Sequence, residues 1–385
     1  MSNRYDVIVL GVGTMGSATC HHLAKRGVRV LGLERFDIPH ERGAMHGFSR
    51  VIRQAYFEHP DYVGLLLRAY QLWNELERES GRKVLHITGG LYMGAPDGEV
   101  IAGSLASARQ HGLPHEVLDH AAVSSRYPQF QLPPQFIGFF ETRAGFLAPE
   151  LAVAAHAERA LRLGAEMRGR EAVVDWRADH SGVTVRTDKG TYHADQLLIC
   201  GGAWSGRIIQ ELGVPLTVTR QVAGWVWPRN PEPFTLGTLP IWNLDPNPRG
   251  QYQGTYYGFP MMPDNPGFKL ALHYPLTPTD PDNVNRDVLP GDEETFRKAL
   301  RDYIPDADGP LLALRTCLYT NTPDGHFILD AHPNPRLSHG RVHIACGFSG
   351  HGFKFATVVG EIMADLATRG QTDLSIDFLR LKRFA

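Results

Sequence analysis

The stretch that decides the fold of this chain is Val7-Ile8-Val9-Leu10-Gly11-Val12-Gly13-Thr14-Met15-Gly16. Its first four residues form a continuous apolar run, which is typical of a strand buried inside a parallel sheet. The glycines that follow have the spacing GxGxxG, and each has a separate purpose. Gly11 permits a tight turn, Gly13 lets the backbone approach a pyrophosphate, and Gly16 allows a helix to pack closely on the strand.

The residues after this motif complete a βαβ unit. Residues 14–26 have the pattern of a helix, and Gly27 stands where a left-handed C-terminal cap is expected. A second apolar strand then ends at Glu34, where a carboxylate would bind the ribose hydroxyls of a dinucleotide. The N-terminus of the helix would offer unpaired N–H groups to the phosphates.

This unit predicts a dinucleotide site. Its predicted cofactor-binding residues are Gly11, Gly13, Thr14, Met15, Gly16, Glu34 and Arg35. The motif leaves open whether the cofactor is FAD or NAD. Glu34 disfavours the 2′-phosphate of NADP, although Arg35 beside it weakens that argument.

Elements of the same kind recur far along the chain. An apolar run over 197–199 leads into a Gly turn, and a predicted strand over 342–345 leads into the turn 347–352 and a helix from about residue 353. We therefore predict an α/β protein whose Rossmann-type domain is built from the discontinuous segments 1–80, 150–215 and 315–385. An inserted substrate domain with an antiparallel sheet would take 81–149 and 216–314. Within it, the aromatic-rich stretch 225–266 predicts loops and edge strands.

The composition excludes several classes of protein. Lys and Arg total 39 against 41 Asp and Glu, which argues against a nucleic-acid partner. The four cysteines form no CxxC pair, so no zinc or thioredoxin-type motif is predicted, and their small number suits a reducing cytoplasm. No apolar stretch approaches the ~20 residues that span a bilayer, and the N-terminus has no signal-peptide pattern. We expect a cytoplasmic protein without a membrane or metal partner.

Five segments of the chain carry a more specific pattern. They are His46-Gly47-Phe48-Ser49-Arg50-Val51-Ile52-Arg53, Tyr256-Tyr257-Gly258-Phe259-Pro260, Gly267-Phe268-Lys269-Leu270, Cys317-Leu318-Tyr319-Thr320, and Gly347-Phe348-Ser349-Gly350-His351-Gly352-Phe353-Lys354-Phe355. Together they resemble the monomeric sarcosine oxidase and N-methyltryptophan oxidase family of FAD-dependent amine oxidases. The order matches from the N-terminus to the last helix, so the resemblance covers nearly the whole chain. It implies FAD as cofactor and a monomer that acts on a small amino acid with oxygen as acceptor.

The resemblance implies that Cys317 binds FAD covalently through a thioether. That chemistry needs a thiolate in an electropositive setting, to which Arg315 could contribute. The residue types alone favour a different interpretation, a buried apolar cysteine.

A predicted strand carries Lys269 and His273 on one face, because side chains alternate along a strand. A solvated outer face would be the ordinary interpretation. The resemblance instead implies that Lys269 lies over the flavin and activates oxygen, where a fixed cation stabilises developing negative charge. It also implies that His273 lines the active site.

Arg53 and Lys354 are the predicted clamp for the substrate carboxylate. Arginine offers a planar fork that fits a carboxylate with two parallel hydrogen bonds. Lys354 is predicted in the first turn of a helix, where the helix dipole disfavours a cation, which favours a functional role. N–H groups of the turn around Gly347, Gly350 and Gly352 would stabilise negative charge on the cofactor. The remaining residues that match family active-site or flavin-contact positions are His46, Arg50, Tyr257 and Tyr319.

The chain departs from the family near the predicted substrate entrance. The departing residues are Ala44, Met45, Phe48, Gln54, Phe57 and His59. Sarcosine is the default substrate. N-methyltryptophan competes with it, since residues 143–147 and 378–384 look closer to that branch, and cyclic amino acids such as proline or pipecolate also stay open.

The implied reaction is oxidative demethylation, in which a hydride equivalent leaves the N-methyl carbon for the flavin. Water hydrolyses the imine to formaldehyde and the free amino acid, and oxygen is reduced to hydrogen peroxide. Two other classes stay open, a nicotinamide-dependent dehydrogenase and a non-catalytic FAD-binding subunit.

Overall fold

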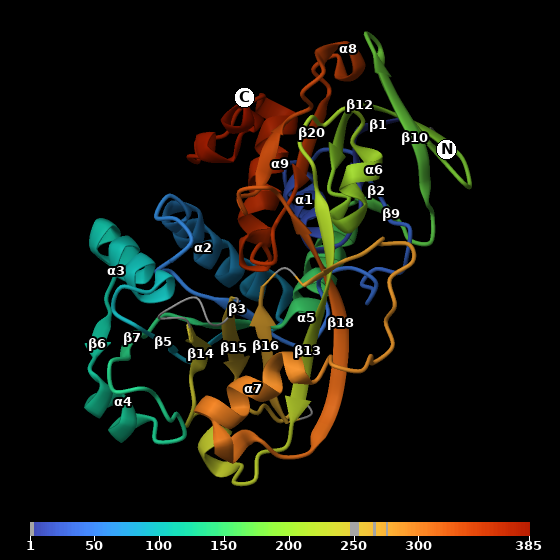
Figure 1. Ribbon diagram of the computed structural model, residues 1–385. Helices are drawn as coiled ribbons and strands as arrows, with labels where there is room; N and C mark the ends of the chain where they lie inside the picture. Colours follow the sequence, from blue (N-terminus) through green and yellow to red (C-terminus); the bar gives the residue numbers. More distant parts are fainter. Residues whose placement is uncertain (1–3, 247–253, 265–266, 275) are drawn as a thin grey trace.

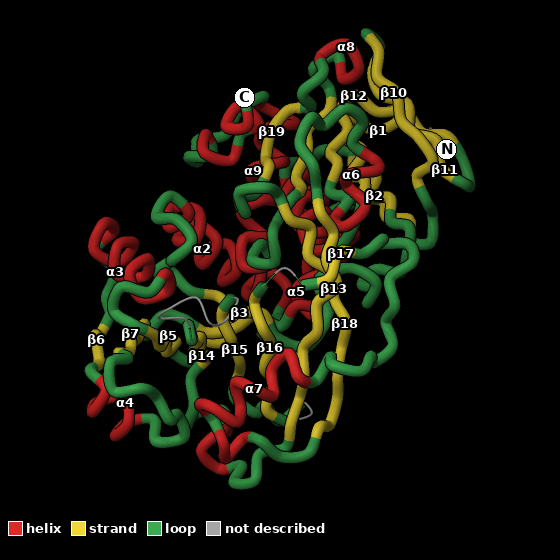
Figure 2. The backbone as a smooth tube through the Cα atoms, in the orientation of Figure 1, coloured by secondary structure: helices red, strands yellow, loops and turns green. Residues whose placement is uncertain are grey.

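The computed structural model describes residues 4–246, 254–264, 267–274 and 276–385. Two large sheets dominate it, and Figure 1 shows one in the upper right part of the molecule and the other below it. Strands β13 (Thr217–Val226) and β18 (Leu311–Asn321) pair along their length and run side by side from the lower sheet toward the upper one (Figure 2).

The first sheet has the order β10-β11-β12-β1-β2-β9, with β20 paired to β12 and β19 to β20. Its parallel strands are β1 (Arg4–Leu10), β2 (Val30–Leu33), β9 (Glu166–Arg168), β12 (Thr191–Ile199) and β20 (Val342–Cys346). The antiparallel additions are β10 (Val173–Asp179), β11 (Gly182–Thr187) and β19 (Ile328–Ala331). Each of the four strands expected from apolar runs is present, so the Rossmann-type unit assembled from separated segments is confirmed.

Helices cover this sheet. α1 (Thr14–Lys25) packs against α5 (Pro149–Arg162) and α9 (Ala356–Arg369), and α2 (Tyr62–Ser80) packs against α9. Contact between α1 and α9 is close, because a Cβ at Gly360 would stand only 2.6 Å from the backbone of Ala18. The last helix begins later than expected, since residues 353–355 form a separate 3₁₀ turn. Short helices are α6 (Ser205–Ile208) and α8 (Pro335–Ser338).

The second sheet has the order β17-β13-β16-β15-β14-β5-β7-β6, and β18 pairs with β13. Its other strands are β5 (Gly90–Gly94), β6 (Glu116–Leu118), β7 (Ile137–Glu141), β14 (Ile241–Leu244), β15 (Thr255–Phe259), β16 (Phe268–His273) and β17 (Thr277–Pro278). α3 (Glu99–His111), α4 (His120–Arg126) and α7 (Glu294–Tyr303) accompany them. Most pairs are antiparallel, as predicted, and β14 with β5 is parallel.

The expectation of edge strands over 225–266 is wrong. β14 and β15 lie in the interior of the second sheet, with neighbours on both sides. Trp242 and Phe259 are fully buried, so their aromatic side chains build a core rather than a solvent-facing edge. Residues 247–253 and 265–266 of this stretch lie outside the described residues.

A small third sheet joins β3 (Arg50–Ile52), β8 (Gly145–Leu147) and β4 (Leu85–Ile87). It positions Arg50 and the loop that precedes it.

The position of strand β18 changes one of the expected domain boundaries. The expected boundary at residue 315 falls inside this strand, which belongs to the second sheet through its pairing with β13. We propose the same two-domain division with this boundary moved to the end of β18. Within the part of the chain that the structure describes, no helix is long and apolar enough to cross a bilayer.

Candidate active site

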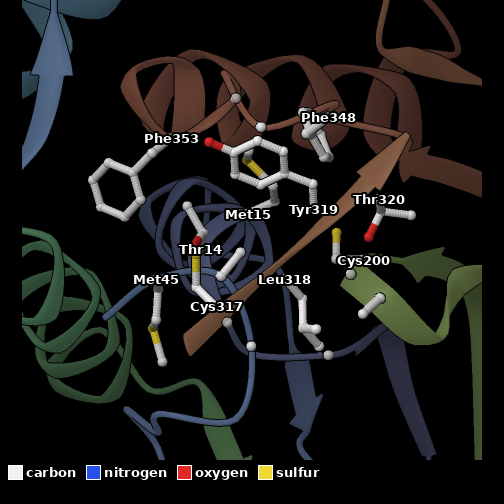
Figure 3. A pocket seen from close by; sticks show the side chains of 18 of the residues that line it. Thr14, Met15, Met45, Cys200, Cys317, Leu318, Tyr319, Thr320, Phe348 and Phe353 are labelled. Carbon is white, nitrogen blue, oxygen red and sulfur yellow. The ribbon is translucent and has the colours of Figure 1, made fainter. Parts of the chain in front are cut away.

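One cavity of about 480 Å³ runs from the glycine motif to the inner face of the second sheet. Figure 3 shows Thr14 and Met15 of α1, Cys317 and Tyr319 of β18, and Phe353 around it. Segments far apart in the sequence therefore line a single space that is continuous from the dinucleotide end to the second sheet.

At one end of the cavity, the glycine motif adopts the predicted turn. Gly11 has φ +87°, and a Cβ there would lie 2.4 Å from the carbonyl oxygen of Cys200. A Cβ on Gly16 would stand 1.7 Å from the Gly11 oxygen, whereas one on Gly13 would meet nothing within 4 Å. Packing therefore requires glycine at positions 11 and 16. Gly13 leaves its backbone open to the cavity, as a pyrophosphate requires.

Glu34 is fixed at the same end. Its carboxylate accepts hydrogen bonds from the backbone N–H groups of Val12 and Phe36, both at 2.9 Å. Burial raises its pKa, and these N–H groups act against the rise. The side chain lines the cavity where the motif predicts contact with a ribose.

Arg35 lies at the rim and is held by a residue that the sequence analysis missed. Its guanidinium pairs with Asp282 at 2.6 Å, and Asp282 also accepts a hydrogen bond from Trp204 Nε1 at 2.8 Å. Arg207 donates to the same carboxylate. These interactions attach the segment before α7 to the first sheet, beside the dinucleotide end of the cavity. No local pattern around Asp282 signals this contact.

Cys317 lies on β18 opposite Gln221 and lines the cavity. Burial raises the pKa of its thiol, and three cations act in the opposite direction. They are Arg50, Lys269 and Arg286. Arg315, which the sequence offered as a helper, instead donates a hydrogen bond to the carbonyl of Leu314.

Lys269 is buried, with 1% of its surface exposed, so it does not lie on a solvated face. Its ammonium group donates to the carbonyl oxygens of Gly47 at 2.6 Å and Ser49 at 2.9 Å. It also lies 4.7 Å from the ring centroid of Phe259. Burial, followed by the charge of Arg50, holds its pKa well below the usual range.

The loop before β3 is organised by Arg50. Its guanidinium donates to the carbonyls of Ala44 at 2.8 Å, His46 at 2.5 Å and Ser49 at 2.8 Å. His46 is buried, and burial lowers its pKa to about 3. Within the described residues its Nε2 has no hydrogen-bond partner, and the side chain lines the cavity.

The predicted clamp residues Arg53 and Lys354 are both buried and face the same ring. The Arg53 guanidinium lies 4.5 Å and the Lys354 ammonium 5.1 Å from the centroid of Tyr56. Lys354 donates to the carbonyl of His351 at 2.7 Å. It belongs to the 3₁₀ turn before α9 rather than to the first turn of an α-helix, so the dipole argument for its role does not apply as stated.

Arg53 has a partner that the sequence analysis did not foresee. Its guanidinium is paired with the carboxylate of Glu58, and its Nε, within the described chain, has no partner. Burial would raise the pKa of Glu58, but Arg53 beside it lowers that pKa to about 2. Burial, with the charge of Arg53, lowers the pKa of Lys354 to about 7.

His273 lies beside two tyrosines, with its ring centroid 6.4 Å from that of Tyr257 and 5.6 Å from that of Tyr319. His273 Nδ1 lies 3.2 Å from the Tyr319 hydroxyl, and burial lowers the pKa of His273 to about 4. Burial raises the pKa of both tyrosines. All three side chains line the cavity.

The turn after β20 closes the cavity from the side of α9. Gly347, Gly350 and Gly352 line it. Gly350 has φ +80°, and a Cβ there would lie 2.3 Å from the ring of Tyr319, so the turn approaches β18 as closely as backbone can.

The departures from the family pattern divide into two groups. Ala44, Met45 and Phe57 line the cavity, whereas Phe48, Gln54 and His59 are not among its lining residues. Phe48 is 43% exposed and packs edge-on against Trp225, while the backbone N–H of Gln54 donates to Glu141 at 2.7 Å.

Comparison with known proteins shows the class of this chain. A family model described as FAD dependent oxidoreductase matches residues 6–366, so the chain belongs to the FAD-dependent oxidoreductase family. This assignment decides the choice of cofactor that the glycine motif left open.

Particular relatives are more specific. The chain is 45% identical to monomeric sarcosine oxidase of Streptomyces avermitilis, an alignment that covers 100% of this chain and 99% of that protein. It is 34% identical to N-methyl-L-tryptophan oxidase of Escherichia coli, with 99% and 100% covered. The resemblance drawn from the five segments is confirmed.

The fold also has close counterparts among solved structures. NikD, an unusual amino acid oxidase essential for nikkomycin biosynthesis, superposes in its open form with a TM-score of 0.85 at 28% identity, covering 98% of this chain and 97% of that chain. Glycine oxidase from Geobacillus kaustophilus, at 23% identity, shares the fold with a TM-score of 0.80, covering 99% of each chain.

Proposed function

We propose that this protein is an oxidase of N-methyl amino acids, with sarcosine as the simplest substrate. The products would be formaldehyde, the free amino acid and hydrogen peroxide. The observation that carries the proposal is the pair of buried cations, Arg53 and Lys354, in the same cavity as the dinucleotide motif and Lys269. The full-length similarity to monomeric sarcosine oxidase supports it.

The chain's own residues fit FAD. Gly13 leaves open backbone at the dinucleotide end, and Glu34 is held in place for a ribose. Cys317 lines the same cavity, and we propose it as the site of a covalent bond to the flavin ring. His46 Nε2, a buried polar atom without a partner within the described residues, is suited to hold the cofactor. FAD supplies the chemistry of accepting two electrons from the substrate and returning them to oxygen.

Substrate positioning follows from the charges. A carboxylate entering between Arg53 and Lys354 would find a guanidinium fork and an ammonium group in a site shielded from water. The interaction fixes the amine and its methyl group at a defined distance from the clamp, which lowers the entropic cost of reaction. Glu58 already neutralises Arg53, so the substrate carboxylate competes with it for the guanidinium.

Lys269 is proposed to act on oxygen. Its acceptors are two carbonyls and a hydroxyl, so hydrogen bonding leaves its charge uncompensated by a directly contacting carboxylate. A fixed cation in a buried site stabilises the negative charge that develops on oxygen during reduction.

One relative favours a second substrate. The similarity to N-methyl-L-tryptophan oxidase supports a larger N-methyl amino acid. We also propose that the enzyme acts as a cytoplasmic monomer, supported by the name of its relative and by its four free cysteines.

The test is peroxide release from the purified protein with sarcosine and N-methyl-L-tryptophan, combined with acid precipitation. We expect peroxide and formaldehyde in equal amounts, and yellow colour that stays in the acid pellet. Colour in the supernatant would refute the covalent bond alone. Absence of peroxide with every N-methyl amino acid, from protein that contains its full complement of FAD, would refute the proposed function.

A further inference from the structure

A row of side chains crosses the inner face of the second sheet beside the clamp. Asn243 on β14 is paired in register with Tyr92 on β5 and with Tyr257 on β15. Residues in register on adjacent strands point to the same face. All three line the cavity, so the face that carries Tyr257 continues as polar side chains toward β5.

Two members of this row have polar atoms that nothing satisfies within the described residues. Tyr92 is fully buried, and its hydroxyl has no partner. Asn243 is 6% exposed; its Nδ2 donates to Thr255 Oγ1 at 3.2 Å, and its Oδ1 has no partner. Buried polar groups are nearly always hydrogen-bonded in folded proteins, because leaving one unpaired destabilises the fold. Two such atoms on adjacent strands therefore indicate a binding role.

The row lies next to the carboxylate clamp. The Arg53 guanidinium is 5.9 Å from the ring centroid of Tyr92 and 4.2 Å from that of Phe57. Arg53 Nε is a third buried atom without a partner in the described chain. In an α-amino acid, the side chain leaves the carbon that bears the carboxylate, so a side chain held by this clamp can reach the row.

We propose that Tyr92 and Asn243 form a polar subsite for the side chain of the substrate. This inference rests on the proposed function and names its substrate class: N-methyl amino acids whose side chain carries a hydroxyl or N–H group. Asn243 Oδ1 accepts from such a group, and the Tyr92 hydroxyl either accepts from it or donates to it. Phe57 and Ile241, which also line the cavity, supply apolar contact for the carbon atoms of that side chain.

The reason for selectivity is physical. A substrate with an apolar side chain would fill the subsite but leave both polar atoms unsatisfied, whereas one with a hydroxyl or N–H would pair them. Sites built to bind a polar group discriminate against analogues that lack it for this reason. For neutral partners, we expect about a tenfold preference in kcat/KM.

The experiment compares matched substrates on the holoenzyme. N-methyl-L-homoserine is paired with N-methyl-L-norvaline, which has a methyl in place of the hydroxyl. N-methyl-L-tryptophan is paired with its benzothiophene analogue, which has sulfur in place of the indole N–H. Oxygen consumption gives kcat/KM for each, and the ratio within a pair is the quantity of interest. Sarcosine serves as the reference for the proposed function.

We expect the polar member to be preferred about tenfold in at least one pair, and Tyr92→Phe and Asn243→Leu to bring that ratio toward one. Tyr70→Phe is the matched control, since it removes a buried hydroxyl that donates to the Arg143 carbonyl and does not line the cavity. It should keep the parent ratio. Ratios near one in the parent enzyme, with sarcosine oxidised, would overturn the subsite and leave the proposed function standing. No turnover of any N-methyl amino acid would overturn both.

Discussion

The proposed clamp predicts that carboxylate binding depends on pH in a defined direction. Burial, with the charge of Arg53, lowers the pKa of Lys354 to about 7, against an ordinary value of about 10.5. Below about pH 7 the empty site already carries the ammonium charge. Above about pH 7 the Lys354 amine of the empty site is neutral. Binding a carboxylate then takes up a proton from solution, because a nearby anion favours the charged form of lysine.

The magnitude follows from linkage. The pKa of Lys354 is about 7 in the empty site, and a bound carboxylate raises it. The dissociation constant of the carboxylate should therefore be constant below pH 7 and rise about tenfold per pH unit above it. Between about pH 6 and pH 9 the loss of affinity reaches about 100-fold, or about 2.7 kcal/mol. Nearby groups do not share this range, since the pKa values of Glu58 and His273 lie at about 2 and about 4.

The assay is titration of the holoenzyme with methoxyacetate, which replaces the amine of sarcosine with an ether oxygen and stays ionised throughout. Changes in the flavin absorbance report binding. Lys354→Met should bind more weakly at pH 6 and show no slope between pH 7 and pH 9. Lys269, whose pKa is also lowered by burial, is the competing source of a slope. A flat profile in the parent enzyme, or a slope that survives in Lys354→Met, would refute the reasoning.

Three further substitutions test other parts of the site. Lys269→Met should slow oxidation of the reduced enzyme by oxygen about 10²-fold or more, with a smaller effect on anaerobic reduction by substrate in stopped flow; similar losses in both steps would contradict a role toward oxygen. Cys317→Ser should release its FAD into the supernatant on acid precipitation, and colour retained in the pellet would place the covalent bond elsewhere. In the Cys317→Ser protein, adding Asp282→Ala should accelerate FAD loss several-fold at low salt, because Arg35 and Arg207 lose their ion pairs with Asp282. High salt should accelerate FAD loss from the Cys317→Ser protein that keeps Asp282, because it screens the same ion pairs. Equal rates of FAD release with and without Asp282 would show that these ion pairs do not retain the cofactor.

The sequence predicts best where one local pattern is sufficient. The glycine motif with Glu34 specifies a strand, a turn, a helix and an acid within one short stretch, and the structure has each of them. Alternation along β16 puts Lys269 and His273 on one face, and both line the cavity. In these cases the interactions that determine the structure join residues close together in the sequence, so the periodicity of the sequence predicts them.

Other features depend on contacts between distant segments. Asp282 meets Arg35 across 247 positions of the chain and Trp204 across 78, and no local sequence pattern signals either contact. Tyr92 and Asn243 become neighbours only through the parallel pairing of β5 with β14. Eight other strands, β6 to β13, lie between these two along the chain. Gly-rich and Pro-rich composition around β14 resembles that of an edge, although packing on both sides makes it interior.

The two buried lysines show how similar burial can produce different chemistry. Lys354 feels the carboxylate of Glu58, which raises its pKa against burial and leaves it near the titration point at about 7. Lys269 donates to carbonyls and a hydroxyl, which orient its side chain, while burial and then the charge of Arg50 lower its pKa. Neutral acceptors suit a cation that must act on charge appearing later, because a permanent carboxylate partner would neutralise it beforehand. A titrating lysine suits a site that exchanges one carboxylate for another. Both lysines donate to backbone carbonyls, so it is the charged neighbours, with Glu58 and Arg53 beside Lys354, that support the proposed division between substrate binding and the step with oxygen.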